Sequence, residues 1–189
     1  MVILIAGGTH TGKTMLAQRL LETAHWPYLS LDHLKMGLIR SGMTRLTPES
    51  SDGELTGLLW PIAREIAKTA IENGQNLVIE GCYIPFHYAG DFPAEYRAFL
   101  SYVCLVFSQS YLECHCDQIL THANRVEIRK DPSVDREELK RENARNLQAC
   151  RVNGTRCFLI DRPCDYDGAL QTLCLELIGE ASERGRRMP

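Results

Sequence analysis

The sequence predicts an α/β domain in which helices cover both faces of a five-stranded parallel sheet. Short apolar runs rich in β-branched residues alternate with segments whose apolar residues recur at helical spacing. This alternation is the order that builds a parallel sheet. In addition, the first apolar run, VILIA at residues 2–6, ends in Gly-Gly, which is typical of a buried strand that passes into a tight loop.

The other elements follow from the same two periodicities. Strands are predicted over residues 2–6, 27–32, 76–81, 102–107 and 155–161. Helices are predicted over residues 13–24, 33–41, 55–73 and 167–180, with a charged helical region over 109–152 that is interrupted near Asp131-Pro132. We therefore expect a single domain over residues 1–181, followed by a tail at 182–189 that lacks regular structure.

Composition and charge are those of an ordinary globular domain, with 44% hydrophobic and 24% charged residues. The net charge of −3 gives no sign of nucleic-acid binding, and no apolar run approaches the ~18 residues of a membrane span. The eight cysteines include no CxxC pair, so we expect reduced thiols and a cytoplasmic protein. Arginine supplies 16 of the 21 basic residues, which fits either a surface bias or the binding of phosphate oxygens.

The stretch GGTHTGKT at residues 7–14 matches the P-loop pattern, Gly7-x4-Gly12-Lys13-Thr14. Glycines let backbone N–H groups converge on an anion, and the following helix adds unpaired N–H groups and a positive dipole end. Lys13 is expected to reach the β- and γ-phosphates, and Thr14 to bind Mg²⁺. A tight turn without a ligand is the alternative. The expected nucleotide-binding residues are Gly7, Gly8, Thr9, His10, Thr11, Gly12, Lys13, Thr14 and Met15.

Acidic residues stand at the ends of other predicted strands, where the ligands of open α/β sheets bind. These residues are Asp32, Glu80 and Asp161. A GTPase is excluded because the chain has no NKxD stretch for guanine recognition, and a motor-type ATPase needs a longer chain. What remains is a small kinase that moves a γ-phosphoryl group onto a compact acceptor.

Four stretches, spread in order along nearly the whole chain, resemble the nucleoside-monophosphate-kinase-like branch of P-loop kinases. They are GGTHTGKT, SLDHLKMGLIR, LVIEGCYIP and the arginine-rich segment 125–145. This branch includes adenylate, shikimate and gluconate kinases, chloramphenicol phosphotransferase and zeta toxins, and there is a looser resemblance to 2-phosphoglycerate kinase-like proteins. The resemblance implies a three-layer P-loop NTPase fold with strand order 2-3-1-4-5 and the cofactors ATP and Mg²⁺. It also implies a flap over about 41–57 and a lid over about 122–140.

The resemblance further implies roles on the acceptor side. Asp32 is expected to face the γ-phosphate, orient an acceptor hydroxyl and accept its proton, as in shikimate kinase-like proteins. The alternative is that Asp32 caps the helix over 33–41, and the two roles can coexist. Arg40 matches the substrate-binding arginine of the family, against the alternative of a solvated surface charge. Gly81 and Tyr83 match its acceptor loop, which here lacks the arginine common in adenylate-kinase-like members.

Two further sets of charged residues complete the expected site. Glu80 stands where a Walker-B-type acid would lie, and direct Mg²⁺ contact, contact through water and a substrate-facing role remain open. Arg125 and Arg129, one helical turn apart, are expected to be catalytic residues of the lid that offset charge on the transferred group.

A second arginine pair, Arg141 and Arg145, also shares a helix face. It can belong to the lid, but three neighbouring acids make surface ion pairs the alternative. These acids are Glu137, Glu138 and Glu142.

Together, the residues and the resemblance predict an ATP- and Mg²⁺-dependent phosphotransferase that acts on a hydroxyl or phosphate of a small metabolite, as shikimate kinase-like or 2-phosphoglycerate kinase-like proteins do. An adenylate kinase-like nucleotide kinase is the first alternative, and a non-catalytic nucleotide-dependent binding module is the second. The expected partners are a nucleoside triphosphate and a small-molecule acceptor, without nucleic acid or membrane. The oligomeric state is left open.

Overall fold

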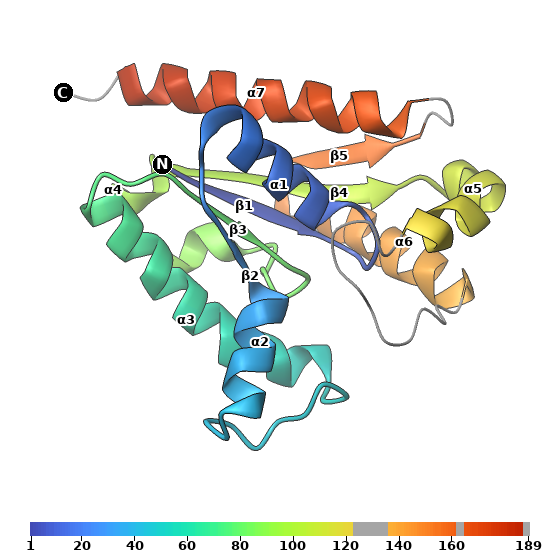
Figure 1. The fold of residues 1–189 in the computed structure, drawn as a ribbon, viewed down its shortest axis with the longest axis horizontal. Helices are drawn as coiled ribbons and strands as arrows, with labels where there is room; N and C mark the ends of the chain where they lie inside the picture. Colours follow the sequence, from blue (N-terminus) through green and yellow to red (C-terminus); the bar gives the residue numbers. More distant parts are fainter. Residues whose placement is uncertain (123–135, 162–164, 187–189) are drawn as a thin grey trace.

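The computed structural model describes residues 1–122, 136–161 and 165–186. Its centre is a sheet in which neighbouring strands are parallel and follow the order β2-β3-β1-β4-β5 (Figure 1). The strands are β1 (Val2–Gly7), β2 (Tyr28–Ser30), β3 (Leu77–Glu80), β4 (Leu100–Phe107) and β5 (Cys157–Ile160). The predicted fold class and strand order are confirmed.

Helices cover both faces of this sheet. α1 and α7 pack on one face, and α3 and α6 pack on the other (Figure 1). The bounds are α1 (Lys13–Ala24), α2 (Leu31–Arg40), α3 (Asp52–Glu72), α4 (Ala94–Arg97), α5 (Gln109–His122), α6 (Arg136–Asn153) and α7 (Tyr166–Arg186), with the 3₁₀ helix η1 (Tyr88–Asp91).

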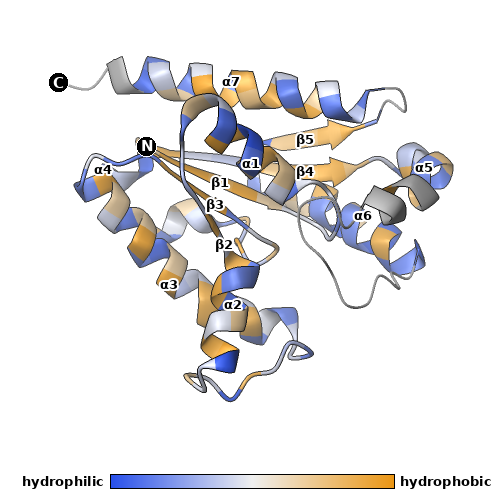
Figure 2. Cartoon of the chain, viewed as in Figure 1, coloured by the Kyte–Doolittle hydropathy of each residue, from blue (hydrophilic) through white to orange (hydrophobic). Residues whose placement is uncertain are grey.

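The central strand β1 is buried on both faces, which explains its continuous apolar sequence. Val2 and Leu4 belong to the cluster shared with α3 and α6, whereas Ile3 and Ile5 belong to the cluster shared with α1 and α7. All four side chains are fully buried, and each contributes about 1.5–3 kcal/mol of hydrophobic stabilisation. Figure 2 shows the same predominance of hydrophobic residues along the strands. None of the described helices is long and apolar enough to cross a membrane.

The boundary between β2 and α2 differs from the prediction. The strand ends at Ser30 and the helix begins at Leu31, so Asp32 is the second residue of α2. Ser30 is the N-cap, with an extended backbone at φ −83° and ψ 125°, and Leu31 is fully buried in the core. The prediction that Asp32 ends a strand is therefore wrong, and so is the alternative that it is the helix N-cap.

The helix α3 begins three residues earlier than predicted because a capping box fixes its first turn. The Ser51 hydroxyl accepts a hydrogen bond from the Glu54 N–H at 3.4 Å, and the Glu54 carboxylate accepts one from the Ser51 N–H at 3.1 Å. Residues 52–57 of the expected flap consequently belong to α3.

The C-terminal helix is longer than predicted. α7 continues through residues 182–186, which the sequence assigns to a tail. Arg184 donates a hydrogen bond from Nη1 to the Leu100 carbonyl oxygen at 2.6 Å. This contact joins the end of α7 to the beginning of β4. Local sequence patterns could not predict it, because the two residues lie far apart in the sequence.

Candidate functional site

The glycine loop, residues 7–14, follows β1 at the carboxyl end of the sheet and leads directly into α1. Gly7 and Gly12 adopt positive φ values of 142° and 84°, which disfavour residues with a side chain. At Gly12 a β-carbon would also collide with the Tyr166 hydroxyl. The loop is held closed by the Gly8 carbonyl, which accepts a hydrogen bond from the Thr11 hydroxyl at 2.8 Å.

The amino end of α1 is left open to an anion. Gly12 is its N-cap and gives no side-chain hydrogen bond, and the first turn contains no acidic residue. The unpaired N–H groups and the positive dipole end are therefore not neutralised within the helix. Lys13 is almost fully buried beside them, where its Nζ donates a hydrogen bond to the Gly8 carbonyl at 2.7 Å. This combination fits a polyphosphate.

Acidic groups around Lys13 keep its ammonium charged. Burial alone would lower the pKa of Lys13, but neighbouring acidic groups outweigh this effect and hold the pKa above its ordinary value. These groups are the Cys82 thiol and the carboxylates of Glu80, Asp32 and Glu142. Because burial raises the pKa of the Cys82 thiol, the carboxylates supply the negative charge at neutral pH. Residues from three separate parts of the chain thus lie around the lysine of the loop.

Thr14 and Glu80 form the part of the site that suits a divalent cation. The Thr14 hydroxyl donates a hydrogen bond to Glu80 Oε1 at 3.3 Å, and Glu80 is 1% exposed at the end of β3. Within the described residues no group of three or more metal-binding side chains occurs. Mg²⁺ typically takes only one or two protein oxygens and completes its shell with water and substrate phosphates, so this pair fits Mg²⁺.

A second polar cluster lies beside the loop and consists of Asp32, Lys35 and Tyr83. Lys35 Nζ donates hydrogen bonds to Asp32 Oδ1 at 2.7 Å and to the Tyr83 hydroxyl at 3.0 Å. Burial would lower the pKa of Lys35, but these two hydrogen bonds raise it well above its ordinary value. Lys35 therefore stays charged and holds the Asp32 carboxylate in place.

Solved structures resemble the fold of this protein over nearly the whole chain. A proposed kinase from Chloroflexus aurantiacus superposes with a TM-score of 0.60 at 16% identity, covering 94% of this chain and 96% of its own. Shikimate kinase from Aquifex aeolicus has a TM-score of 0.59 at 12% identity, and the superposition covers 96% of this chain and 98% of the kinase. A sugar kinase from Janibacter has a TM-score of 0.56 at 14% identity, with 96% of each chain covered. The chain has the P-loop kinase fold. No protein-family model and no curated protein matches the sequence.

Among the P-loop residues named from the sequence, Met15 has a different role from the polar residues. Thr9, Thr11 and Lys13 have a backbone or side-chain polar group in the hydrogen-bond network of the loop. Met15 instead packs its side chain against the core between the sheet and α1 and α7. Met15 can therefore contribute to a ligand site only through its backbone.

Other predicted acceptor-side residues lie apart from the Asp32 cluster or have a packing role. Arg40 is exposed at the last position of α2, eight residues or about 12 Å along the helix from Asp32, so the structure does not bring them together. At Gly81, a β-carbon would lie 2.7 Å from the β-carbon of Leu31. The absence of a side chain at Gly81 thus makes room for the first turn of α2.

The predicted lid arginines Arg125 and Arg129 lie outside the described residues. The second pair, Arg141 and Arg145, forms ion pairs with Glu138 at 2.9 and 2.8 Å on the exposed face of α6. For this pair the surface ion-pair alternative is the one observed.

Sequence reasoning missed Lys35 and Glu142. Lys35 follows Asp32 by three positions, a spacing that places both on one helix face and could have indicated the pair. Glu142 was expected at most in a surface ion pair, but its Oε2 accepts a hydrogen bond from the Thr9 N–H at 2.9 Å. That contact joins residues 133 positions apart, so no local sequence pattern could predict it.

Asn143 positions α6 next to the P-loop and is 1% exposed. Its Oδ1 accepts a hydrogen bond from the Phe107 N–H at 2.9 Å, and its Nδ2 donates one to the Leu139 carbonyl at 2.8 Å. The side chain thus ties α6 to the carboxyl end of β4, beside the strand that carries the P-loop.

Replacement of Asn143 by alanine is expected to lower the free energy of unfolding by about 2 kcal/mol, because the buried Phe107 N–H loses its acceptor. Urea denaturation measures this loss. Asn153→Ala is the matched control, since Asn153 lies on the same helix and its Nδ2 bonds to the Ala149 carbonyl at an exposed position. Equal losses in the two variants would contradict the anchoring role of Asn143.

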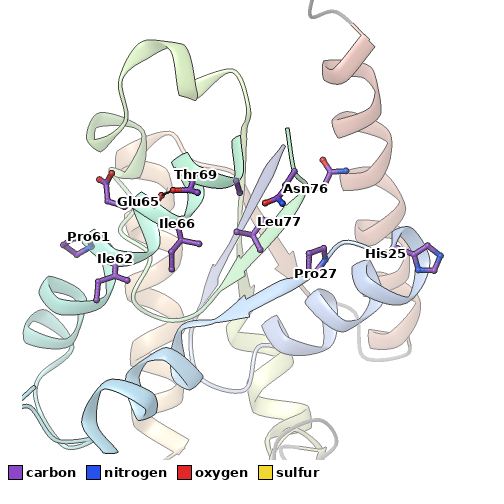
Figure 3. Close-up of a pocket in the computed structure, with 11 residues that line it drawn as sticks. His25, Pro27, Pro61, Ile62, Glu65, Ile66, Thr69, Asn76 and Leu77 are labelled. Atoms are coloured by element: carbon purple, nitrogen blue, oxygen red, sulfur yellow. Dashed lines mark hydrogen bonds between the residues drawn. The ribbon is translucent and has the colours of Figure 1, made fainter. Parts of the chain in front are cut away.

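An apolar groove of about 1020 Å³ lies elsewhere, between α3 and the amino ends of β2 and β3 (Figure 3). Ile62, Ile66, Pro27 and Leu77 form much of its wall. Since the P-loop follows the carboxyl end of β1 in the same parallel sheet, this groove lies at the opposite end of the strands from the Lys13 site. It is not part of that site.

Proposed function

We propose that the protein is an ATP- and Mg²⁺-dependent phosphotransferase that moves the γ-phosphoryl group to a hydroxyl or phosphate of a small metabolite. The observation that carries this proposal is the position of Asp32. The negative charge of its carboxylate helps to raise the pKa of Lys13 in the P-loop. The Asp32 Oδ1 atom also accepts a hydrogen bond from Lys35 Nζ at 2.7 Å. A P-loop cation and an oriented carboxylate thus share one site, as phosphoryl transfer to a hydroxyl requires.

On the nucleotide side, the P-loop amides and the amino end of α1 would bind the phosphates, together with the Lys13 ammonium. Thr14 and Glu80 would hold Mg²⁺, which when bound neutralises charge on the phosphate oxygens. Because Glu80 is almost fully buried, its carboxylate has little freedom to turn toward solvent. Glu80 would therefore keep its position beside Thr14 when the metal ion binds.

On the acceptor side, Asp32 would orient the acceptor hydroxyl and accept its proton as the new phosphorus–oxygen bond forms and the bond to the leaving ADP breaks. Lys35 would keep the Asp32 carboxylate in place through its 2.7 Å hydrogen bond. Tyr83, 7% exposed, would help to position Lys35, because its hydroxyl accepts a hydrogen bond from the Lys35 ammonium at 3.0 Å.

We favour a metabolite over a nucleoside monophosphate as the acceptor. The loop after β3 reads Gly81-Cys82-Tyr83-Ile84-Pro85 and offers no arginine to bind the phosphate of a nucleotide acceptor. The cation beside Asp32 is instead Lys35, whose charge is already shared with that carboxylate. The described part of the site thus suits an acceptor hydroxyl better than a second nucleotide.

A screen for ADP release tests the proposal. Purified protein is incubated with ATP, Mg²⁺ and each member of a panel of hydroxylated and phosphorylated metabolites, with AMP, CMP, UMP and dTMP included. The Lys13→Ala variant serves as the blank. We expect at least one non-nucleotide metabolite to raise ADP release far above the blank.

The other outcomes are equally informative. A response to the monophosphates alone would replace the metabolite kinase by a nucleotide kinase. ATP use that no compound raises above a slow background would favour a nucleotide-dependent binding module and contradict the enzyme.

A further inference from the structure

Glu142 places a carboxylate directly on the P-loop. Its Oε2 accepts the hydrogen bond from the Thr9 N–H at 2.9 Å, in a partly buried setting. A β-carbon at Gly8 would lie 2.9 Å from this same oxygen, so the missing side chain at Gly8 gives the carboxylate access to the amide. The negative charge of Glu142 also stabilises the protonated form of Lys13 and so helps to raise its pKa.

The helix α6 holds Glu142 in this position. The adjacent Asn143 is bonded to the end of β4, and Figure 1 shows α6 beside the carboxyl ends of β1 and β4. Other acids of α6 behave differently, since Glu137 and Glu138 lie at the surface and pair with cations of the same helix. Within the described residues Glu142 forms no such ion pair, and its hydrogen bond is to the loop.

The Thr9 amide belongs to a set of N–H groups that suits an anion of any kind. Loop amides and the amino end of α1 attract negative charge because their dipoles point toward the same space. The carboxylate of Glu142 satisfies one of these donors. A phosphate that approaches the same donors meets a like charge at close range, and two anions in such contact repel each other.

We propose that Glu142 competes with the nucleotide phosphates for the P-loop, so that nucleotide binding requires its carboxylate to leave the Thr9 amide. This inference rests on the proposed function, because it assumes that the P-loop binds phosphate. It makes nucleotide affinity depend on the position of α6. A displacement of this helix away from the loop strengthens nucleotide binding, and its return weakens it.

The test compares wild type with Glu142→Gln and with a matched control, Glu137→Gln. Both variants remove one negative charge from α6, but Glu137 pairs with Lys140 at 3.0 Å on the surface. By isothermal titration calorimetry with MgATP, we expect Glu142→Gln to bind about tenfold more tightly, because a hydrogen bond to a charged group no longer has to be broken. Glu137→Gln should bind within about twofold of wild type, as expected for a surface pair.

A second measurement needs no nucleotide. In the ¹H–¹⁵N spectrum, the Thr9 amide proton should move upfield in Glu142→Gln and stay in place in Glu137→Gln, because a charged acceptor is replaced by a neutral one only in the former. The same spectra show whether each variant keeps the fold.

Equal or weaker MgATP binding by Glu142→Gln would overturn the inference, and so would an unchanged Thr9 amide. Failure of the proposed function looks different. In that case wild type, Glu142→Gln and Lys13→Ala would give the same titration without binding, whereas failure of the inference alone leaves wild type binding MgATP and Lys13→Ala not.

Discussion

Lys13→Ala is expected to weaken ATP binding at least 100-fold and to reduce phosphoryl transfer to background. Removing one member of a buried, hydrogen-bonded charge pair costs about 3 kcal/mol, which is the source of the 100-fold figure. The local charge strengthens the effect. Without the ammonium, the negative charges of Glu80, Asp32 and Glu142 remain around the phosphate site, of which Lys35 balances only that of Asp32, and they repel a polyanion.

The affinity is measured by calorimetry with MgATP. Lys68→Ala is the matched control, because Lys68 lies on α3 and pairs with Glu65 at 3.0 Å away from the P-loop. This control should bind ATP like wild type. Urea denaturation establishes that Lys13→Ala is folded, and Lys13→Gln, which keeps most of the length of the side chain, provides a second variant if it is not. ATP binding by folded Lys13 variants within threefold of wild type would contradict the proposed phosphate site.

Asp32→Asn is expected to lower the turnover of the acceptor by about 10³-fold while ATP binding is retained, as is typical when a general base is removed. Asparagine keeps the size of the side chain and can still accept a hydrogen bond from Lys35, but it cannot take up the acceptor proton. Because Asp32 is 30% exposed in its side chain, the substitution should change the free energy of unfolding little.

The measurement pairs steady-state turnover with calorimetry. Asp52→Asn is the control, since Asp52 is also an acid in the first turn of a helix, at the exposed start of α3. It reports any effect of the helix dipole alone and should leave turnover unchanged. Normal turnover of the true acceptor by Asp32→Asn would remove the proton-accepting role from Asp32.

The sheet could be predicted from sequence because its signals are local. VILIA has an apolar residue at every position because β1 is covered on both faces, and that pattern can be recognised without knowing the cover. The P-loop is equally local. Its glycines, lysine and threonine occupy eight consecutive positions, and their spacing alone specifies a loop that joins a strand to a helix.

The boundaries of helices and strands were less predictable where the same residues could continue a strand or begin a helix. The sequence predicts a continuous strand over residues 27–32, yet the chain turns into α2 after Ser30. The buried position of Leu31 beside Gly81 decides that boundary, and Gly81 lies far away in sequence. The same reason applies to the end of α7, where Arg184 bonds to Leu100.

For this protein, then, the amino-acid sequence by itself determined the parallel sheet, its strand order through family resemblance, and the P-loop with Lys13 and Thr14. Only the tertiary structure decided that Lys35 rather than Arg40 lies against Asp32, and that Glu142 reaches Thr9. The physical reason is distance along the chain. A hydrogen bond between residues 133 positions apart depends on how whole helices pack on the sheet, whereas the shape of an eight-residue loop depends on its own backbone.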